Sequence, residues 1–151
     1  MNLDELRHKI NEKFPQSILA TSSFRGEDTI ILRAEDLLDI CRYLHDDPEI
    51  SFNYLTDLCG VDYFPREPRF EVVYHLCSLK TRCRLRLKVP LPGESPQLAS
   101  VTSIWQGAEW LEREVYDLLG ITFVGHPDLR RILLPPDWQG HPLRKDYPLR
   151  G

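Results

Sequence analysis

Residues 70–77, FEVVYHLC, and residues 83–89, CRLRLKV, carry the strongest strand signal in the chain. Apolar side chains occupy both faces of the first stretch, which predicts a strand that is central in its sheet. In the second stretch apolar residues alternate strictly with basic ones, which predicts one buried and one basic face. The basic residues are Arg82, Arg84, Arg86 and Lys88. We expect this second strand to lie nearer an edge of the sheet.

Helical and strand-like patterns on either side of these strands predict an α+β fold. The predicted helices are residues 3–13, 37–47 and 104–119, and the further strands are residues 17–23, 28–33 and 52–58. The first two of these strands flank a turn-like segment, which predicts a hairpin. Gly60 is expected to end the third strand, and Gly120 is expected to end the last helix. Because the strands are grouped with helices between the groups, we predict a two-layer sandwich of a mostly antiparallel sheet with helices.

The length and composition of the chain fit one ordinary hydrophobic core. It has 151 residues, of which 42% are hydrophobic, and a formal net charge of -4, so nothing in its charge favours nucleic acid. The apolar runs are far shorter than the roughly 20 residues that cross a bilayer. The first six residues resemble neither a secretory signal nor a transit peptide. We therefore expect a soluble protein without direct membrane insertion that works in the compartment where it is made, by default a bacterial cytoplasm.

Common site motifs are missing from the sequence. The cysteines at 41, 59, 77 and 83 include no C-x-x-C pair, so we expect buried free thiols rather than an iron–sulfur or structural zinc site. Two Gly-His-Pro triplets, at 125–127 and 140–142, lack further ligands at metal-site spacing and favour turns. No motif for nucleotide, phosphate or nucleophile chemistry is present. The basic strand face favours a solvated or partner-facing surface over phosphate binding.

Residues 120–151 differ from the rest of the chain, because five prolines exclude long helices and central strands there. Eleven apolar side chains nevertheless make disorder a poor prediction. We predict a globular domain at residues 1–119 and, at residues 120–151, an extended Pro-rich tail that is covered by a partner protein. The tail carries five basic residues against three acidic ones, which favours an acidic partner.

A charged helix and the tail together form the longest motif of the sequence. The run Glu112-Arg113-Glu114-Val115-Tyr116-Asp117-Leu118-Leu119-Gly120, followed by His126, Arg130, Ile132 and Leu133, resembles the signature of the 30 kDa family, the C subunits of the respiratory-chain NADH dehydrogenase. Residues 125–149 and the upstream Leu55-Thr56-Asp57-Leu58-Cys59-Gly60-Val61-Asp62 are also similar to that family. From the residues alone, the charges at 112–117 also allow paired carboxylates for acid–base chemistry, or a solvated helix face with Arg113 and Asp117 as an i,i+4 pair.

The resemblance implies a non-catalytic, cofactor-free structural and assembly subunit of complex I, the proton-translocating NADH:quinone oxidoreductase. Such a protein docks on subunits D, B and I of the same complex, of which D holds the quinone site and B and I are iron–sulfur proteins. The resemblance implies that FMN, the iron–sulfur clusters and quinone are bound by other subunits, and that this hetero-oligomer is peripheral on the cytoplasmic side of the bacterial inner membrane. Two alternatives stay open. One is the equivalent subunit of a membrane-bound nickel-iron hydrogenase or another non-NADH reductase, including quinone and F420 types. The other is a free-standing enzyme with Glu114 or Asp117 as its base.

For this chain the resemblance implies no catalytic, cofactor-binding or metal-binding residue, and a subunit interface formed by the charged helix and the tail. The expected interface residues are Glu112, Arg113, Glu114, Asp117, His126, Arg130, Arg131, Trp138, His141, Arg144, Lys145, Asp146 and Tyr147.

Overall fold

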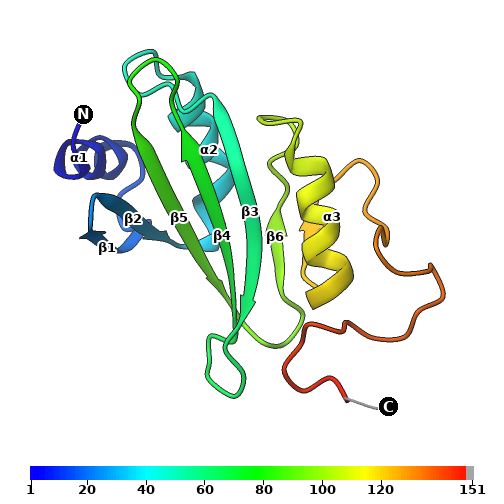
Figure 1. Cartoon of the computed structure of the whole chain (residues 1–151). Helices are drawn as coiled ribbons and strands as arrows, with labels where there is room; N and C mark the ends of the chain where they lie inside the picture. Colours follow the sequence, from blue (N-terminus) through cyan, green and yellow to red (C-terminus); the bar gives the residue numbers. More distant parts are fainter. Residues whose placement is uncertain (149–151) are drawn as a thin grey trace.

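The computed structural model describes residues 1–148, which form helices, two sheets and a long C-terminal segment without regular structure (Figure 1). The helices are α1 (Leu3–Lys13), α2 (Leu37–Asp46) and α3 (Ala108–Leu119), and a short 3-10 helix, η1 (Ala34–Asp36), precedes α2. The strands are β1 (Ile18–Phe24), β2 (Glu27–Leu32), β3 (Tyr54–Asp62), β4 (Phe70–Cys77), β5 (Arg84–Leu91), β6 (Gln97–Ala99) and β7 (Thr122–Val124).

Five strands form the main sheet in the order β1-β2-β5-β4-β3. All neighbouring pairs are antiparallel except β2 and β5, so the predicted α+β fold with a mostly antiparallel sheet is confirmed. The interior position predicted for β4 is also confirmed. The edge position predicted for β5 is wrong, because β2 pairs parallel with it and makes it the middle strand. Its basic face is tolerated there because neighbouring strands supply acids: Arg86 pairs with Glu27 at 2.9 Å, and Lys88 lies 3.9 Å from Glu71.

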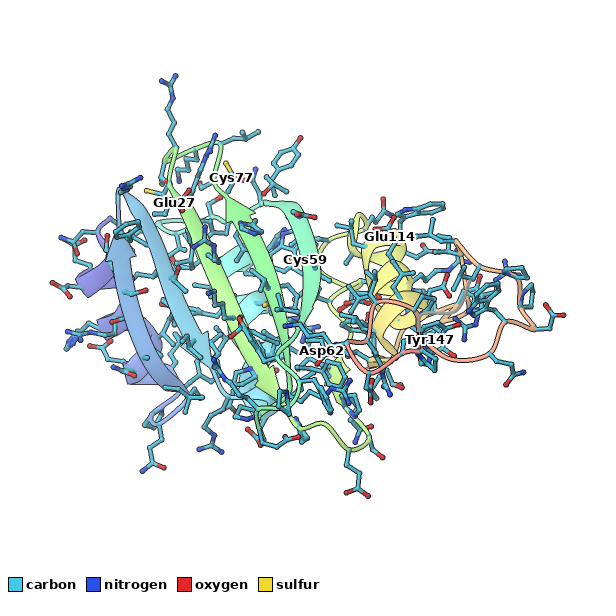
Figure 2. All side chains as sticks on the ribbon, turned by 60° about the horizontal axis from the view of Figure 1, so that its bottom comes forward. Glu27, Cys59, Asp62, Cys77, Glu114 and Tyr147 are labelled. Carbon is cyan, nitrogen blue, oxygen red and sulfur yellow. The ribbon has the colours of Figure 1, made fainter. Side chains whose placement is uncertain are left out.

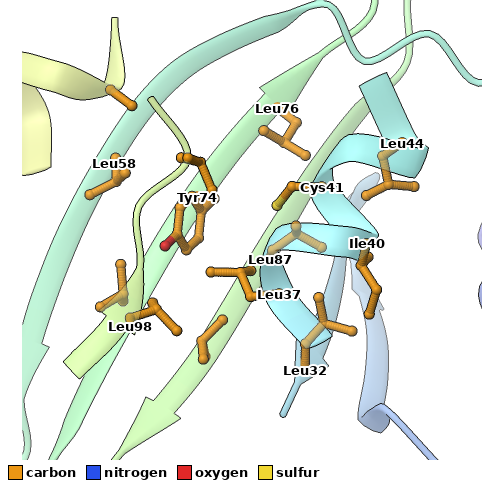
Figure 3. Close-up of a cluster of buried hydrophobic side chains, with 14 of the residues drawn as sticks. Leu32, Leu37, Ile40, Cys41, Leu44, Leu58, Tyr74, Leu76, Leu87 and Leu98 are labelled. Carbon is orange, nitrogen blue, oxygen red and sulfur yellow. The ribbon is translucent and has the colours of Figure 1, made fainter. Parts of the chain in front are cut away.

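The core lies between one face of this sheet and the helices. Figure 3 shows Leu37, Ile40, Cys41 and Leu44 of α2 beside Tyr74 and Leu76 of β4 and Leu87 of β5. Leu6 and Ile10 of α1 join the same cluster of buried side chains. These positions follow the apolar periods of the sequence, 3.6 residues in the helices and 2 in the strands. The opposite face of the sheet carries the polar alternate residues, such as His75 and Arg86.

A second, smaller sheet places α3 against the first one. Its strands β6 and β7 run parallel and bury Leu98 and Phe123. The sequence did not predict them, because each is only three residues long. Residues 102–107 form turns, so α3 begins at Ala108 and not at 104. Gly60 does not end β3, which continues to Asp62. A Cβ at Gly60 would lie 2.6 Å from Leu119 Cδ1, so the glycine allows α3 to approach the sheet closely.

The core extends beyond residue 119, because the buried Ile121 and Phe123 belong to its cluster of side chains. The predicted division of the chain at that residue stays a prediction.

All four cysteines are free, but only Cys41 is buried, so the expectation of buried thiols is wrong for the other three. Among residues 1–148 no helix is both long and apolar enough to cross a membrane.

Candidate functional site

Within the tail, residues 125–148 leave β7, run beside α3 and return toward the end of β3 (Figure 1). Polar contacts from α3 and β3 hold this segment along much of its length. The residues predicted as an interface therefore divide into those that hold the tail in place and those that the tail presents outward. Figure 2 shows Asp62 beside the returning tail and Tyr147 within it.

Asp117 in the last turn of α3 is the first anchor. Its carboxylate is fully buried, and Oδ1 accepts a hydrogen bond from Arg131 at 2.6 Å. Oδ2 accepts three backbone amides of the tail at 2.8–3.1 Å, those of Ile132, Leu133 and Leu134. A negative charge near the C-terminus of a helix is unfavourable, so these donors compensate the helix dipole as well as the loss of water. Burial raises the pKa of Asp117, but the donors outweigh it and the net pKa lies below its ordinary value.

The tail also caps the C-terminus of α3. The last carbonyls of a helix have no partner inside it. His141 Nδ1–H donates to the carbonyl of Asp117 at 2.9 Å, the Leu143 amide donates to that of Leu118 at 2.9 Å, and Arg144 Nε donates to that of Leu119 at 2.6 Å. Gly120, at φ +77°, turns the chain there as predicted, and a Cβ would collide with His141 and Arg144. The helix end and the tail therefore fit each other directly.

Asp62 and Arg69, at the end of β3 and the start of β4, form the second anchor. Arg69 donates twice to Asp62, with both distances 2.8 Å, and twice to Asp146, at 2.7 and 3.4 Å. The Lys145 amide donates to Asp62 Oδ2 at 2.8 Å. The Arg69 guanidinium holds the pKa values of the Asp62 and Asp146 carboxyls below their ordinary values. The ion pairs thus join the sheet to a segment more than 70 residues away in the sequence.

Contacts near the start of the tail complete its attachment. Arg113 donates to the carbonyls of Arg130 and Arg131, both at 3.2 Å. His126 donates from Nε2 to the carbonyl of Glu109 at 2.9 Å, while its Nδ1 accepts the Asp128 amide. The i,i+4 pair considered for Arg113 and Asp117 does not form, because each is engaged with the tail.

Glu112 points into the molecule. It is fully buried and accepts hydrogen bonds from Ser100 Oγ at 2.6 Å and from the Val101 amide at 2.9 Å. Burial raises the pKa of this carboxyl above its ordinary value, although both donors oppose the shift. Glu112 therefore ties α3 to the loop before it.

A smaller group of side chains faces outward. Glu114 accepts a hydrogen bond from the Trp110 indole at 3.0 Å, and Arg130 pairs with the neighbouring Asp128 at 3.0 Å. Three apolar side chains of the tail are strongly exposed: Leu133 at 52%, Trp138 at 42% and Leu143 at 60%. A tail that is held by polar contacts on one side and presents apolar side chains on the other has the features of a binding surface.

The geometry also bears on acid–base chemistry at this site. Asp117 is engaged by an arginine and three amides and its pKa is lowered, so it is poorly suited to take up a proton near neutral pH. Of the anchor residues, sequence reasoning missed Asp62 and Arg69. Asp62 is the last residue of the run 55–62, whose similarity to the family could have indicated a functional residue there. No pattern in the sequence indicates Arg69.

Comparison with known proteins gives consistent matches in sequence. The model of the family described as "Respiratory-chain NADH dehydrogenase, 30 Kd subunit" matches residues 30–151. The C subunit of the NADH-quinone oxidoreductase of Roseiflexus sp. (strain RS-1) is 52% identical over 141 residues, which cover 93% of this chain and 81% of that protein. The C subunit of the Geobacter sulfurreducens enzyme is 51% identical over 144 residues, covering 95% and 88%.

Two solved structures are similar to this fold. The trypsin-resistant fragment of Nqo5 superposes with a TM-score of 0.70 at 36% identity, and the match covers 85% of this chain and all of the fragment. A chain of the membrane-bound sulfane sulfur reductase, an archaeal respiratory membrane complex, superposes with a TM-score of 0.79 at 26% identity, covering 97% of this chain and 85% of that one.

Proposed function

The chain belongs to the 30 kDa subunit family of the respiratory-chain NADH dehydrogenase, and from this premise we propose that it is a non-catalytic structural and assembly subunit. Its place is the hydrophilic arm of a proton-translocating NADH:quinone oxidoreductase, docked on subunits D, B and I, of which D holds the quinone site and B and I are iron–sulfur proteins. FMN, iron–sulfur clusters and quinone belong to other subunits, and this chain contributes none. The complex is a hetero-oligomer at the cytoplasmic side of the bacterial inner membrane, where this protein is peripheral.

The observation that carries the proposal is the two-sided tail. Its backbone is fixed by Asp117 and Asp62, while Leu133, Trp138 and Leu143 are exposed. Ordering a segment in advance lowers the conformational entropy that is lost on binding, so a pre-anchored tail binds a partner at lower cost than a flexible one. Exposed aromatic and aliphatic residues are typical of the centre of a protein interface.

The roles of the charged residues support the same proposal. Asp117, Arg131, His141 and Arg144 hold the helix and the tail together, which is a structural task. Lys145 contributes its amide to the anchor, and Tyr147 packs beside Gly140 and donates to the carbonyl of Gln139, so both shape the tail. Among the predicted interface residues, Arg130, Trp138 and Lys145 are exposed and Glu114 is partly exposed, so their side chains can face a partner. The excess of basic residues in the tail favours an acidic partner surface.

Substitutions on the outward face test the proposal. We expect the double variant Trp138→Glu/Leu143→Glu to fold as the wild type but to leave the arm unassembled, because charges would enter an apolar interface. The matched control is Leu19→Glu/Leu79→Glu, which places the same charges on side chains of 52% and 62% exposure outside the tail. Point variants are sharper than removal of residues 121–151, which would also remove the buried Ile121 and Phe123.

The readouts are co-purification of the other subunits from membranes and NADH:quinone oxidoreductase activity, with circular dichroism of each variant as the check on folding. The control is expected to assemble. Full assembly and activity of the tail variant would contradict the docking role. Equal losses in tail and control variants would also contradict it, because the tail would then have no special part in assembly.

A second candidate is the equivalent subunit of a respiratory complex with another electron donor or acceptor, such as a membrane-bound nickel-iron hydrogenase or an F420-type reductase. The likeness to a chain of an archaeal sulfane sulfur reductase supports this candidate. The identity of about 50% to subunits of NADH-quinone oxidoreductases ranks it second. The subunits that co-purify distinguish the two, because a flavin- and NADH-binding subunit supports the first and a nickel-binding subunit the second.

A further inference from the structure

We propose that Asp57, Cys59 and His75 form a binding site for a divalent cation of the zinc class, on the sheet face opposite α2. Asp57 and Cys59 belong to β3 and His75 to β4, where Asp57 and His75 are directly paired across the strands. One ligand atom of each side chain lies within 4.8 Å of the others. The site lies apart from the tail anchors, so it is independent of the proposed docking role.

The three donors fit zinc better than the hard cations. Carboxylate oxygen, thiolate sulfur and imidazole nitrogen are its usual ligands, at about 2.0–2.3 Å, whereas Mg²⁺ and Ca²⁺ prefer oxygen alone. A tetrahedral ion would hold these atoms about 3.3–3.8 Å apart. Since no pair of ligand atoms is more than 4.8 Å apart, the side chains have to close by at most about 1.5 Å, which a small rotation of χ angles on two hydrogen-bonded strands can supply.

The ligand atoms are available. Within residues 1–148 neither the imidazole of His75 nor the thiol of Cys59 takes part in a hydrogen bond, and both side chains are partly exposed. Asp57 is held by one oxygen, which accepts the Leu58 amide at 2.9 Å, so its other oxygen can bind an ion. Metal binding through the free oxygen of Asp57, the thiol of Cys59 and the imidazole of His75 therefore breaks no hydrogen bond of these side chains.

The local charges favour a cation. Burial raises the pKa of the Cys59 thiol, and the carboxylates of Asp57 and Glu71 raise it further. The negative potential that opposes the Cys59 thiolate attracts a divalent ion, and a bound ion would neutralise the charges of the thiolate and of the Asp57 carboxylate. The nearby Arg86 opposes the ion, but its guanidinium is engaged with Glu27 at 2.9 Å.

The site is open to solvent. Asp57 and His75 line a groove of about 520 Å³ between β3 and the β1–β2 turn, which Glu27, Arg84 and Arg86 also line. Figure 2 places Cys59 on β3 and Cys77 at the end of β4. Three protein ligands and one side toward the groove leave a fourth position for water or for a side chain of another molecule.

Cobalt and zinc titration of the untagged full-length chain tests the proposal. We expect one Co²⁺ to bind with the thiolate-to-metal charge-transfer band and the visible bands of tetrahedral coordination, and Zn²⁺ to displace it. Cys59→Ser should abolish the charge-transfer band, and His75→Gln should weaken Zn²⁺ binding by at least about tenfold, since even the loss of an outer-shell partner costs 10- to 100-fold. Cys77→Ser is the matched control, because Cys77 is a free, partly exposed thiol that lines the same groove outside the proposed ligand set, and this variant should bind as the wild type.

Circular dichroism and thermal unfolding without metal check that every variant folds. A wild-type chain that is folded and gives no thiolate–cobalt band would overturn the proposal. A band that survives Cys59→Ser but is lost in Cys77→Ser would also overturn it, because the metal would then sit at another thiol. A Zn²⁺-dependent rise in the melting temperature of the wild type that is absent from Cys59→Ser would give independent support.

Discussion

A single carboxylate oxygen of Asp117 receives three consecutive backbone amides of the tail, while the other oxygen receives Arg131. We expect Asp117→Asn to lower the free energy of unfolding by about 3 kcal/mol, because the amide cannot balance the largely buried Arg131. Urea denaturation at pH 7 measures the loss. The control Glu114→Gln changes a partly exposed residue of the same helix, whose partner is the exposed Trp110 indole, and should stay within about 0.5 kcal/mol of the wild type. An unchanged midpoint for Asp117→Asn would show that this anchor contributes nothing.

Gly60 provides a second test at the scale of one residue. An alanine Cβ there would lie 2.6 Å from Leu119 Cδ1 and 3.0 Å from Val115 Cγ1, so we expect Gly60→Ala to destabilise the fold by about 1–3 kcal/mol through overpacking of α3 on β3. Thermal unfolding measures the change. Gly107→Ala is the control, because its Cβ would meet no atom within 4 Å, and it should be neutral or slightly stabilising. Equal melting temperatures for both variants would contradict the close approach.

At the scale of elements, the parts that the sequence predicted well are those with local causes. The apolar periods of α1, α2, β4 and β5 identify elements whose burial is set by neighbours along the chain. The middle position of β5 depends on its parallel pairing with β2, about 57 residues away, and no local pattern encodes that pairing. The triplets β6 and β7 are too short to show a period. The order of the strands in the sheet could therefore not be predicted from the sequence and is known only from the structure.

The candidate site divides in the same way. The family motif indicated Asp117, Arg131 and His141 as functional residues, but it did not predict that the side chains of Arg131 and His141 contact Asp117 within the chain. The anchor at Arg69 joins residues that are distant in sequence. The sequence does not predict the proposed cation site, because cysteine spacing indicates ligands that are close along the chain, whereas His75 comes from the neighbouring strand.

The tail, taken as one element, should loosen as the pH falls through the titration of His141. Burial lowers the pKa of this imidazole, and Arg131 and Arg144 lower it further. A folded pKa below the unfolded value of about 6.5 means that this contribution to stability is complete above that value and decreases as the pH falls through the folded pKa. We expect the urea midpoint of the wild type to fall between pH 7 and 5.

His141→Gln separates this effect from other acid effects, because glutamine keeps a donor for the Asp117 carbonyl and cannot be protonated. Its midpoint should fall less than that of the wild type over the same pH range. Parallel curves for the two proteins would remove His141 as the cause. The lowered pKa values of Asp62, Asp117 and Asp146 do not interfere, since their contribution is present above an unfolded pKa of about 4 and is lost only at lower pH.

At the scale of the whole molecule, the chain has a net charge of -4 although its tail is basic. Part of the tail's positive charge is used internally, where Arg131 neutralises Asp117. Arg130 is different, because its side chain is 72% exposed and pairs only with the exposed Asp128 among residues 1–148. Exposed charges at the rim of an interface act mainly on the rate of association and on its dependence on salt. Arg130 is therefore the tail residue that we expect to attract an acidic partner electrostatically.

We expect Arg130→Glu to leave the unfolding free energy of the isolated chain within about 0.5 kcal/mol of the wild type while slowing its association with an arm that lacks this protein. The slowing should be largest at low ionic strength and fade as salt screens the charges. Arg7→Glu makes the same change of charge on an exposed side chain of α1 and serves as the control. Equal slowing by both variants would show that the net charge of the chain matters and the tail does not. Slowing by Arg130→Glu alone would place the acidic partner surface opposite the tail, because the two variants have the same net charge and differ only in where the new carboxylate lies.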